Sequence, residues 1–190
     1  MNAWIDFYKP FFATPEAARS FVESLEKNKP SDPRYPATVM MHQAQRLISI
    51  ADDIDVIRPE QYSLKLFFLV ICTETMSKLF QRSPENCESR HAVRFFFDQF
   101  ISDHNQEVLT SAFKKPYHPK STIETVADCL YDVRADVVLE GKHWEFKFKE
   151  NGTPMLNLDP EGNVYIVSID YAELRHIIVQ GCIKAIQDYA

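Results

Sequence analysis

The sequence is poor in glycine and has no paired cysteines. Its 190 residues include four glycines and no glycine-rich phosphate loop, which excludes the common nucleotide-binding loops. The four cysteines form no Cys-x-x-Cys pair and have no histidine at zinc-like spacing, so neither a disulfide framework nor a structural metal site is expected. We expect all four to be reduced and buried: Cys72, Cys87, Cys129 and Cys182.

An excess of positive charge and a long apolar run are also missing. The chain has 21 Lys and Arg against 27 Asp and Glu, a formal net charge of -6. Coating nucleic acid or anionic membrane needs concentrated positive charge, so only a local basic patch can serve such binding here. The strongest apolar run, residues 64–72, contains Lys65 and falls far short of the roughly 20 residues that span a bilayer. Residues 1–12 do not have a signal-peptide pattern, and we expect a cytoplasmic protein with no membrane partner.

Apolar residues at helical spacing are abundant. Hydrophobic residues make up 45% of the chain, enough for one core in a single domain over residues 1–190. Thr14 before Pro15 predicts a helix over 15–27, within an N-terminal helical extension of residues 1–35. The apolar periodicity predicts further helices at about 38–58, 59–80 and 91–113.

Two capping boxes predict the starts of the last two helices. In the first, the Ser121 hydroxyl and the Glu124 carboxylate satisfy the first amides of a helix that Gly141 ends. In the second, Asp170 and Glu173 do the same for the C-terminal helix.

A β-hairpin is predicted between these two helices. Residues 143–149 alternate polar and aromatic side chains, and residues 163–169 are β-branched, so we expect the two segments to pair. The predicted fold class is therefore mainly α. It is an antiparallel bundle of five to six helices over residues 36–190, with one β-hairpin inserted before the C-terminal helix.

The helix over 121–140 has one apolar side chain away from its core face. The core stripe has spacings of three and four: Ile123, Val126, Leu130, Val133 and Val137. Arg134 flanks this stripe, whereas Leu139 falls on the opposite side, beside acidic residues. Two interpretations stay open. Either the last turn packs locally and the Arg134 stem covers apolar surface, or Arg134 and Leu139 line a groove for a partner.

Residues 130–141, Leu-Tyr-Asp-Val-Arg-Ala-Asp-Val-Val-Leu-Glu-Gly, resemble the signature helix of HEPN domains. That family commonly shows an Arg, a small polar residue, three more residues, a His, and often Glu-Gly or Gly. More loosely, the apolar helix that contains Glu74 resembles an earlier family helix, and the helix from Asp170 resembles the final one. The resemblance covers residues from about 38 to 188, and only the segment around Arg134 is specific.

The resemblance implies a metal-independent, cofactor-free RNA-cleaving toxin or phage-defence protein. It implies a homodimer in which the Arg and His of both protomers meet in a cleft, RNA as the substrate, and an antitoxin or nucleotidyltransferase as partner. In such chemistry a His moves protons and an Arg stabilises the phosphorane charge. Arg134 matches the family's Arg, but Ala135 replaces the polar residue and Leu139 replaces the His. Leucine cannot transfer a proton, so the Arg-x4-His motif is incomplete and the protein is expected to be inactive as written.

Three explanations of Leu139 stay open. The chain is a natural non-catalytic member that binds RNA, nucleotide or protein, or an inactivated toxic ribonuclease, or an enzyme with another base such as His143. Glu74 and Asp136 are candidates for tuning the site, and Lys147 for contacting phosphate, although a solvated surface also explains Asp136 and Lys147. The alternative function is a non-enzymatic protein- or nucleotide-binding helical module.

Overall fold

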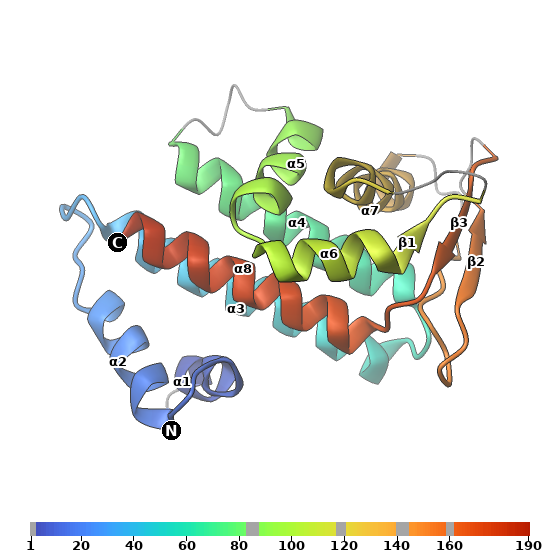
Figure 1. The fold of residues 1–190 in the computed structure, drawn as a ribbon. Coiled ribbons are helices and arrows are strands. Elements are labelled where there is room, and N and C mark those ends of the chain that lie inside the picture. Colours follow the sequence, from blue (N-terminus) through green and yellow to red (C-terminus); the bar gives the residue numbers. More distant parts are fainter. Residues whose placement is uncertain (1–2, 83–87, 117–120, 140–144, 159–161) are drawn as a thin grey trace.

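The computed structural model describes residues 3–82, 88–116, 121–139, 145–158 and 162–190, except the side chains of residues 138 and 139. The mainly α fold class is confirmed within these ranges (Figure 1). The helices are α1 (Ala3–Tyr8), α2 (Pro15–Glu26), α3 (Tyr35–Ile57), α4 (Tyr62–Gln81), α5 (Ser89–Gln99), α6 (Asp103–Ala112), α7 (Ile123–Leu139) and α8 (Tyr171–Tyr189), with a 3-10 turn at Lys9–Phe11. In the described ranges, α3 to α8 make up the predicted bundle of five to six helices.

Helix α4 lies at the centre of the bundle. It packs against α3, α5, α7 and α8, and α8 lies along α3 (Figure 1). A helix with neighbours on most sides needs apolar residues on most of its surface, which explains why its sequence is apolar almost all round. Polar side chains buried on α4 therefore need partners within the bundle, and Glu74 is one of them.

The N-terminal helices pack against the first long helix. The Tyr8 side chain is fully buried, and its hydroxyl donates a 2.8 Å hydrogen bond to the Met41 carbonyl of α3. The Tyr8 ring also meets Phe21 of α2, with ring centroids 5.2 Å apart. These contacts join α1 and α2 to the same apolar core as the bundle.

The predicted helix over 91–113 is wrong in one respect, because two helices occupy this range. Helix α5 ends at Gln99 and α6 begins at Asp103, where the Ser102 hydroxyl accepts a hydrogen bond from the Asn105 amide. The Gln106 side chain then donates to the carbonyls of Phe97 and Asp98 near the end of α5 and to that of Ile101 just beyond it. A capping serine inside an otherwise helical apolar pattern thus breaks the helix.

The two predicted capping boxes have different outcomes. At α8, the Asp170 side chain accepts from the Glu173 amide and the Glu173 side chain from the Asp170 amide, as expected. At α7, the hydroxyl of Thr122, and not of Ser121, accepts from the Thr125 amide at 3.2 Å. The first box is therefore wrong, since the cap shifts by one residue and Glu124 is used elsewhere.

A small antiparallel sheet precedes α8 and lies at the other end of the bundle from α2 (Figure 1). Its strands, in the order β1-β3-β2, are β1 (Phe113–Lys114), β2 (Met155–Leu158) and β3 (Val164–Val167). Met155 and Phe113 both pair with Val167, so β3 is central. A hairpin is present with its second strand in the predicted place, but its first strand is β2. The described residues 145–149 reach the second predicted segment through one backbone bond, from the Lys149 amide to the Ile169 carbonyl.

Residues 145–149 keep the predicted alternation without joining the sheet, and residues 143–144 lie outside the described ranges. Phe146 and Phe148 are buried. The backbone N–H and carbonyl of Lys147 bond to the Asn157 side chain instead of to a strand ladder. Asn151 and Gly152, both with positive φ, then turn the chain, so that the following residues pair with β3.

The remaining expectations concern membranes and cysteines. None of the described helices is long and apolar enough to cross a membrane. Cys72, Cys129 and Cys182 are buried and form no disulfide, as expected, whereas Cys87 lies outside the described residues.

Candidate functional site

Arg134 lies between α7 and the central helix α4. Its core-facing neighbours Leu130 and Val133 are fully buried, and the Arg134 side chain is 20% exposed beside them. Its Nη2 atom is 3.1 Å from Oε2 of Glu74 on α4. The structure thus brings together two of the residues that the sequence singled out.

Glu74 is held firmly by other groups. Its Oε1 atom accepts hydrogen bonds of 2.6 Å from the Lys78 ammonium and from the Ser89 hydroxyl. Burial pushes the pKa of Glu74 upward, but these two hydrogen bonds and the charges of Arg134 and Lys78 outweigh it, so the pKa lies below its ordinary value. The carboxylate is therefore ionised at neutral pH.

The contact between Arg134 and Glu74 is an ion pair without a directed hydrogen bond. Among the residues that the structure describes, neither Glu74 Oε2 nor Arg134 Nε has a hydrogen-bond partner, although both atoms are buried. Lys78 and Arg134 together carry two positive charges against the one negative charge of Glu74. The cluster of Glu74, Lys78 and Arg134 therefore carries one more positive than negative charge.

An aromatic ring lies beside the Arg134 guanidinium. The guanidinium carbon is 5.7 Å from the ring centroid of Tyr131, and that of Arg90 on α5 is 4.6 Å from the same centroid. Both distances are within the range of cation–π attraction. Tyr131 thus connects the Arg134 side of α7 to α5.

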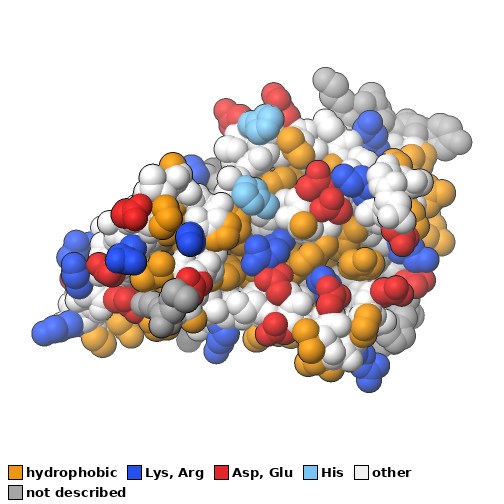
Figure 2. Space-filling view, turned by 90° about the horizontal axis from the view of Figure 1, so that it is seen from below, with side chains coloured by type: hydrophobic (Ala, Val, Ile, Leu, Met, Phe, Trp, Pro, Cys, Tyr) orange, Lys and Arg blue, Asp and Glu red, His pale blue; other side chains and the backbone are white. Residues whose placement is uncertain are grey.

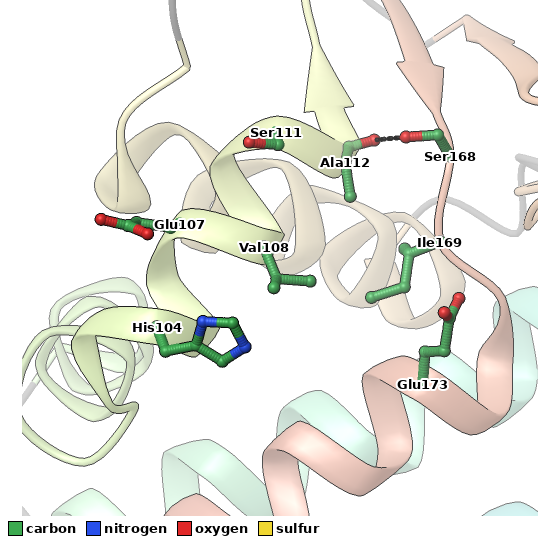
Figure 3. Close-up of a pocket in the computed structure, with 8 residues that line it drawn as sticks. All are labelled: His104, Glu107, Val108, Ser111, Ala112, Ser168, Ile169 and Glu173. Atoms are coloured by element: carbon green, nitrogen blue, oxygen red, sulfur yellow. Dashed lines mark hydrogen bonds between the residues drawn. The ribbon is translucent and has the colours of Figure 1, made fainter.

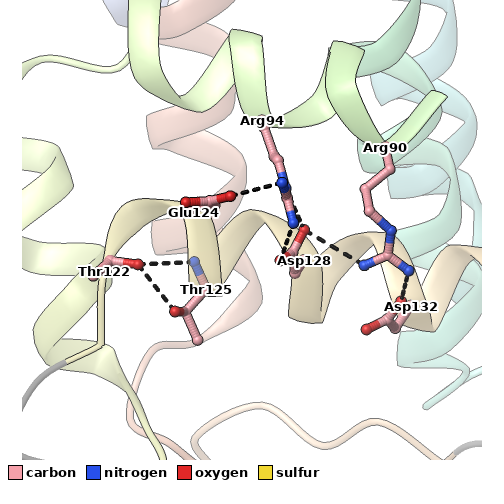
Figure 4. A network of polar contacts seen from close by, with 7 residues as sticks. All are labelled: Arg90, Arg94, Thr122, Glu124, Thr125, Asp128 and Asp132. Carbon is pink, nitrogen blue, oxygen red and sulfur yellow. Dashed lines mark hydrogen bonds and ion pairs between the residues drawn. The ribbon is translucent and has the colours of Figure 1, made fainter. Parts of the chain in front are cut away.

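The acidic face of α7 packs against α5 (Figure 4). Arg94 forms a two-bonded fork with Asp128 at 2.7 Å and an ion pair with Glu124 at 2.6 Å. Arg90 contacts Asp132 at 2.5 Å and Asp128 at 3.4 Å. We name these five residues the α5–α7 ladder. Sequence reasoning missed it, although acids four residues apart and arginines four residues apart were the signal.

The other predicted site residues lie apart from this cluster or outside the described parts. The Lys147 ammonium pairs with Glu145 at 3.3 Å and is 44% exposed. Asp136 lies half-buried on α7, two residues beyond Arg134. Leu139 is the last residue of α7, but its side chain and all of His143 lie outside what the structure describes.

A separate cavity of about 380 Å³ lies between α6 and the start of α8 (Figure 3). His104 and Glu107, whose residue types are found at metal sites, line it together with Glu173. Glu173 already bonds to Lys149 and caps α8. No cluster of three metal-ligating side chains occurs in the described ranges. The residues that line the cavity include none of Glu74, Lys78 and Arg134, so the cavity is distinct from that cluster.

The surface agrees with the absence of bulk positive charge. On the face in Figure 2, Lys and Arg side chains are interspersed with Asp and Glu and with hydrophobic patches. Binding of a polyanion to this face would therefore depend on local sites and not on a broad basic area.

The comparisons add no relative. No protein-family model matches the chain, and no curated protein and no solved structure matches it significantly. The likeness to HEPN domains therefore depends on the sequence, chiefly that of residues 130–141.

Proposed function

We propose that the chain is a HEPN-like protein that binds RNA through Arg134 and derives from a metal-independent ribonuclease of the toxin or phage-defence type. In this proposal the protein acts in the cytoplasm as a homodimer, with an antitoxin or a nucleotidyltransferase as its partner. With this sequence it is inactive, because Leu139 occupies the position of the family's catalytic His.

The arrangement of Arg134 is the observation that supports this proposal best. A guanidinium that binds phosphate needs positive charge and unsatisfied N–H groups. Arg134 keeps positive charge, since Lys78 also neutralises Glu74, and its side chain is 20% exposed, while its buried Nε has no hydrogen-bond partner in the described part of the chain. An arginine fixed only for stability would more often be fully hydrogen-bonded to its carboxylate.

The homodimer is proposed from the HEPN resemblance, and helix geometry says what it must bring together. Positions 134 and 139 are five residues apart, which corresponds to about 7.5 Å along a helix and about 140° around it. Side chains at these positions diverge on one copy of α7. A second copy related by a two-fold axis would bring Arg134 of one protomer toward position 139 of the other, as the HEPN resemblance implies.

Restoring the missing base tests the proposal. Leu139→His should cleave single-stranded RNA in EDTA, and Leu139→His with Arg134→Ala should not, because the restored base then lacks the cation. The unmodified chain is the matched inactive control. Intact RNA with a folded, dimeric Leu139→His protein would contradict the proposal.

A protein-binding module is the second candidate. The observation that favours it is the outer face of β2, where Leu156 and Leu158 are 68% and 61% exposed while Asn157 between them is buried. Apolar side chains on an edge strand are typical of an association surface. This candidate predicts that RNA binding, if measured, does not depend on Arg134.

A further inference from the structure

We infer that Tyr131 is a positioning residue for Arg134 and that Arg90 in turn fixes Tyr131. The inference deepens the proposed function and rests on it. It concerns which contacts orient the Arg134 guanidinium, because the ion pair with Glu74 does not fix its orientation.

An ion pair without a hydrogen bond sets a distance but not an orientation. The Arg134 Nη2 atom lies 3.1 Å from Glu74 Oε2, yet that oxygen accepts no hydrogen bond within the described residues. Tyr131 is three positions earlier on α7, which makes the two side chains neighbours on the helix surface. The ring is 5.7 Å from the Arg134 guanidinium carbon, within the range of cation–π attraction, so it restricts where the guanidinium lies.

Arg90 holds the ring from α5. Its guanidinium carbon is 4.6 Å from the Tyr131 centroid, closer than that of Arg134. Arg90 is itself fixed by Asp132 at 2.5 Å and by Asp128 at 3.4 Å. The ring therefore lies against a side chain that two carboxylates immobilise.

The two arginines next to Tyr131 have different electrostatic surroundings. Two carboxylates neutralise Arg90, although Asp128 is shared with Arg94. Arg134 shares a single carboxylate with Lys78. Arg90 therefore acts as an anchor, whereas Arg134 keeps positive charge for a phosphate.

Loss of the ring should weaken RNA binding without removing any charge. In Tyr131→Leu, the Arg134 guanidinium loses the ring that restricts it. It can then rotate within its ion pair with Glu74 or turn into solvent, so fewer molecules present it to phosphate. Tyr131→Phe keeps the ring and should restore the orientation. Arg90→Gln removes the anchor but leaves the ring in place.

The experiment is fluorescence anisotropy with a labelled single-stranded RNA oligonucleotide and the full chain. We expect Arg134→Ala to weaken binding most, Tyr131→Leu to raise Kd by roughly three- to tenfold, and Tyr131→Phe to stay within about twofold. Arg90→Gln should raise Kd by about twofold or more. Melting temperatures show that each variant is folded, and Arg90→Gln keeps the test valid should Tyr131→Leu fail to fold.

The outcomes separate this inference from the proposed function. Equal RNA binding by the unmodified chain and Arg134→Ala would overturn the proposed function itself. Weak binding by Arg134→Ala together with unchanged binding by folded Tyr131→Leu or Arg90→Gln would overturn only the positioning role. A Tyr131→Phe protein as weak as Tyr131→Leu would assign the effect to the hydroxyl and also overturn it.

Discussion

Arg134 and Glu74 lie 3.1 Å apart across the contact between α7 and α4 without a hydrogen bond between them. The carboxylate uses its other oxygen for Lys78 and Ser89. Glu74 is thus fixed by its own helix and by α5, while Arg134 is attracted to it by charge alone.

Glu74 should make stability depend on pH in the acid range. Because the folded-state pKa of Glu74 lies below its ordinary value near 4.5, its contribution is present above that value and is lost as pH falls through the folded-state pKa. Glu74→Gln should lower the free energy of unfolding at pH 7 by about 1–3 kcal/mol, since Lys78 and Arg134 lose their counter-charge. Urea denaturation from pH 7 to pH 2 measures this.

The control for that experiment is Glu23→Gln, a substitution of an exposed acid on α2. Its pH profile should follow that of the unmodified chain. The Glu74→Gln profile should converge with both at the lowest pH. A constant difference in unfolding free energy between Glu74→Gln and the unmodified chain across the whole pH range would contradict the lowered pKa of Glu74.

The α5–α7 ladder should contribute modestly and in a salt-dependent way. Arg94 and Asp128 form a two-bonded fork, but their side chains are 38% and 25% exposed. A double-mutant cycle with Arg94→Ala and Asp128→Ala should give a coupling free energy of about 0.5–1 kcal/mol that falls in 1 M salt. A coupling near zero at low salt would mean that the fork does not stabilise the contact of α5 with α7.

Gly181 should not tolerate a methyl group. A Cβ atom there would lie 2.7 Å from Ile101 Cδ1 and 2.9 Å from Phe96 Cζ, so these two side chains or α8 itself would have to shift. Alanine normally favours a helix over glycine by about 1 kcal/mol, but overpacking costs about 1–3 kcal/mol. We expect Gly181→Ala to destabilise the protein, and Gln187→Ala on the exposed side of α8 not to. A more stable Gly181→Ala protein would contradict the close packing.

The helices were predictable where a cap or a complete apolar stripe marks them. Thr14 with Pro15 and Asp170 with Glu173 define the starts of α2 and α8, and both agree with the structure. The break at Ser102 was missed, because the apolar periodicity continues through it and only the local capping bond reveals it. Periodicity reports which residues face the core, and it does not report whether the helix axis bends between them.

The hairpin shows a different limit. Residues 145–149 have the alternation of a strand and bury Phe146 and Phe148, yet their backbone bonds mainly to side chains, those of Asn157 and Ser63, and reaches the predicted partner segment only from the Lys149 amide to the Ile169 carbonyl. Alternation reflects burial on one side and not the identity of the hydrogen-bond partner. The Asn151-Gly152 pair was the available signal that the chain turns back between residues 145–149 and β2.

The candidate site was predictable only in part. Glu74 on an apolar helix implied a buried charge in need of a partner, and the structure gives it Arg134 and Lys78. Lys78 is four residues after Glu74 on the same helix, so its ion pair with Glu74 could also have been predicted from the sequence. The contact between Tyr131 and Arg90 could not have been predicted, because it depends on how α5 crosses α7.

The NMR signal of Arg134 Nε tests most directly the claim that Arg134 binds RNA. In nitrogen-15 NMR spectra of the full chain, the Nε–Hε signal of Arg134, identified by its loss in Arg134→Lys, should shift on addition of a single-stranded RNA oligonucleotide. The Arg94 signal should stay in place, because its Nε already donates to Asp128 at 2.7 Å. An Arg134 signal that does not move when the RNA is in saturating excess would contradict the account.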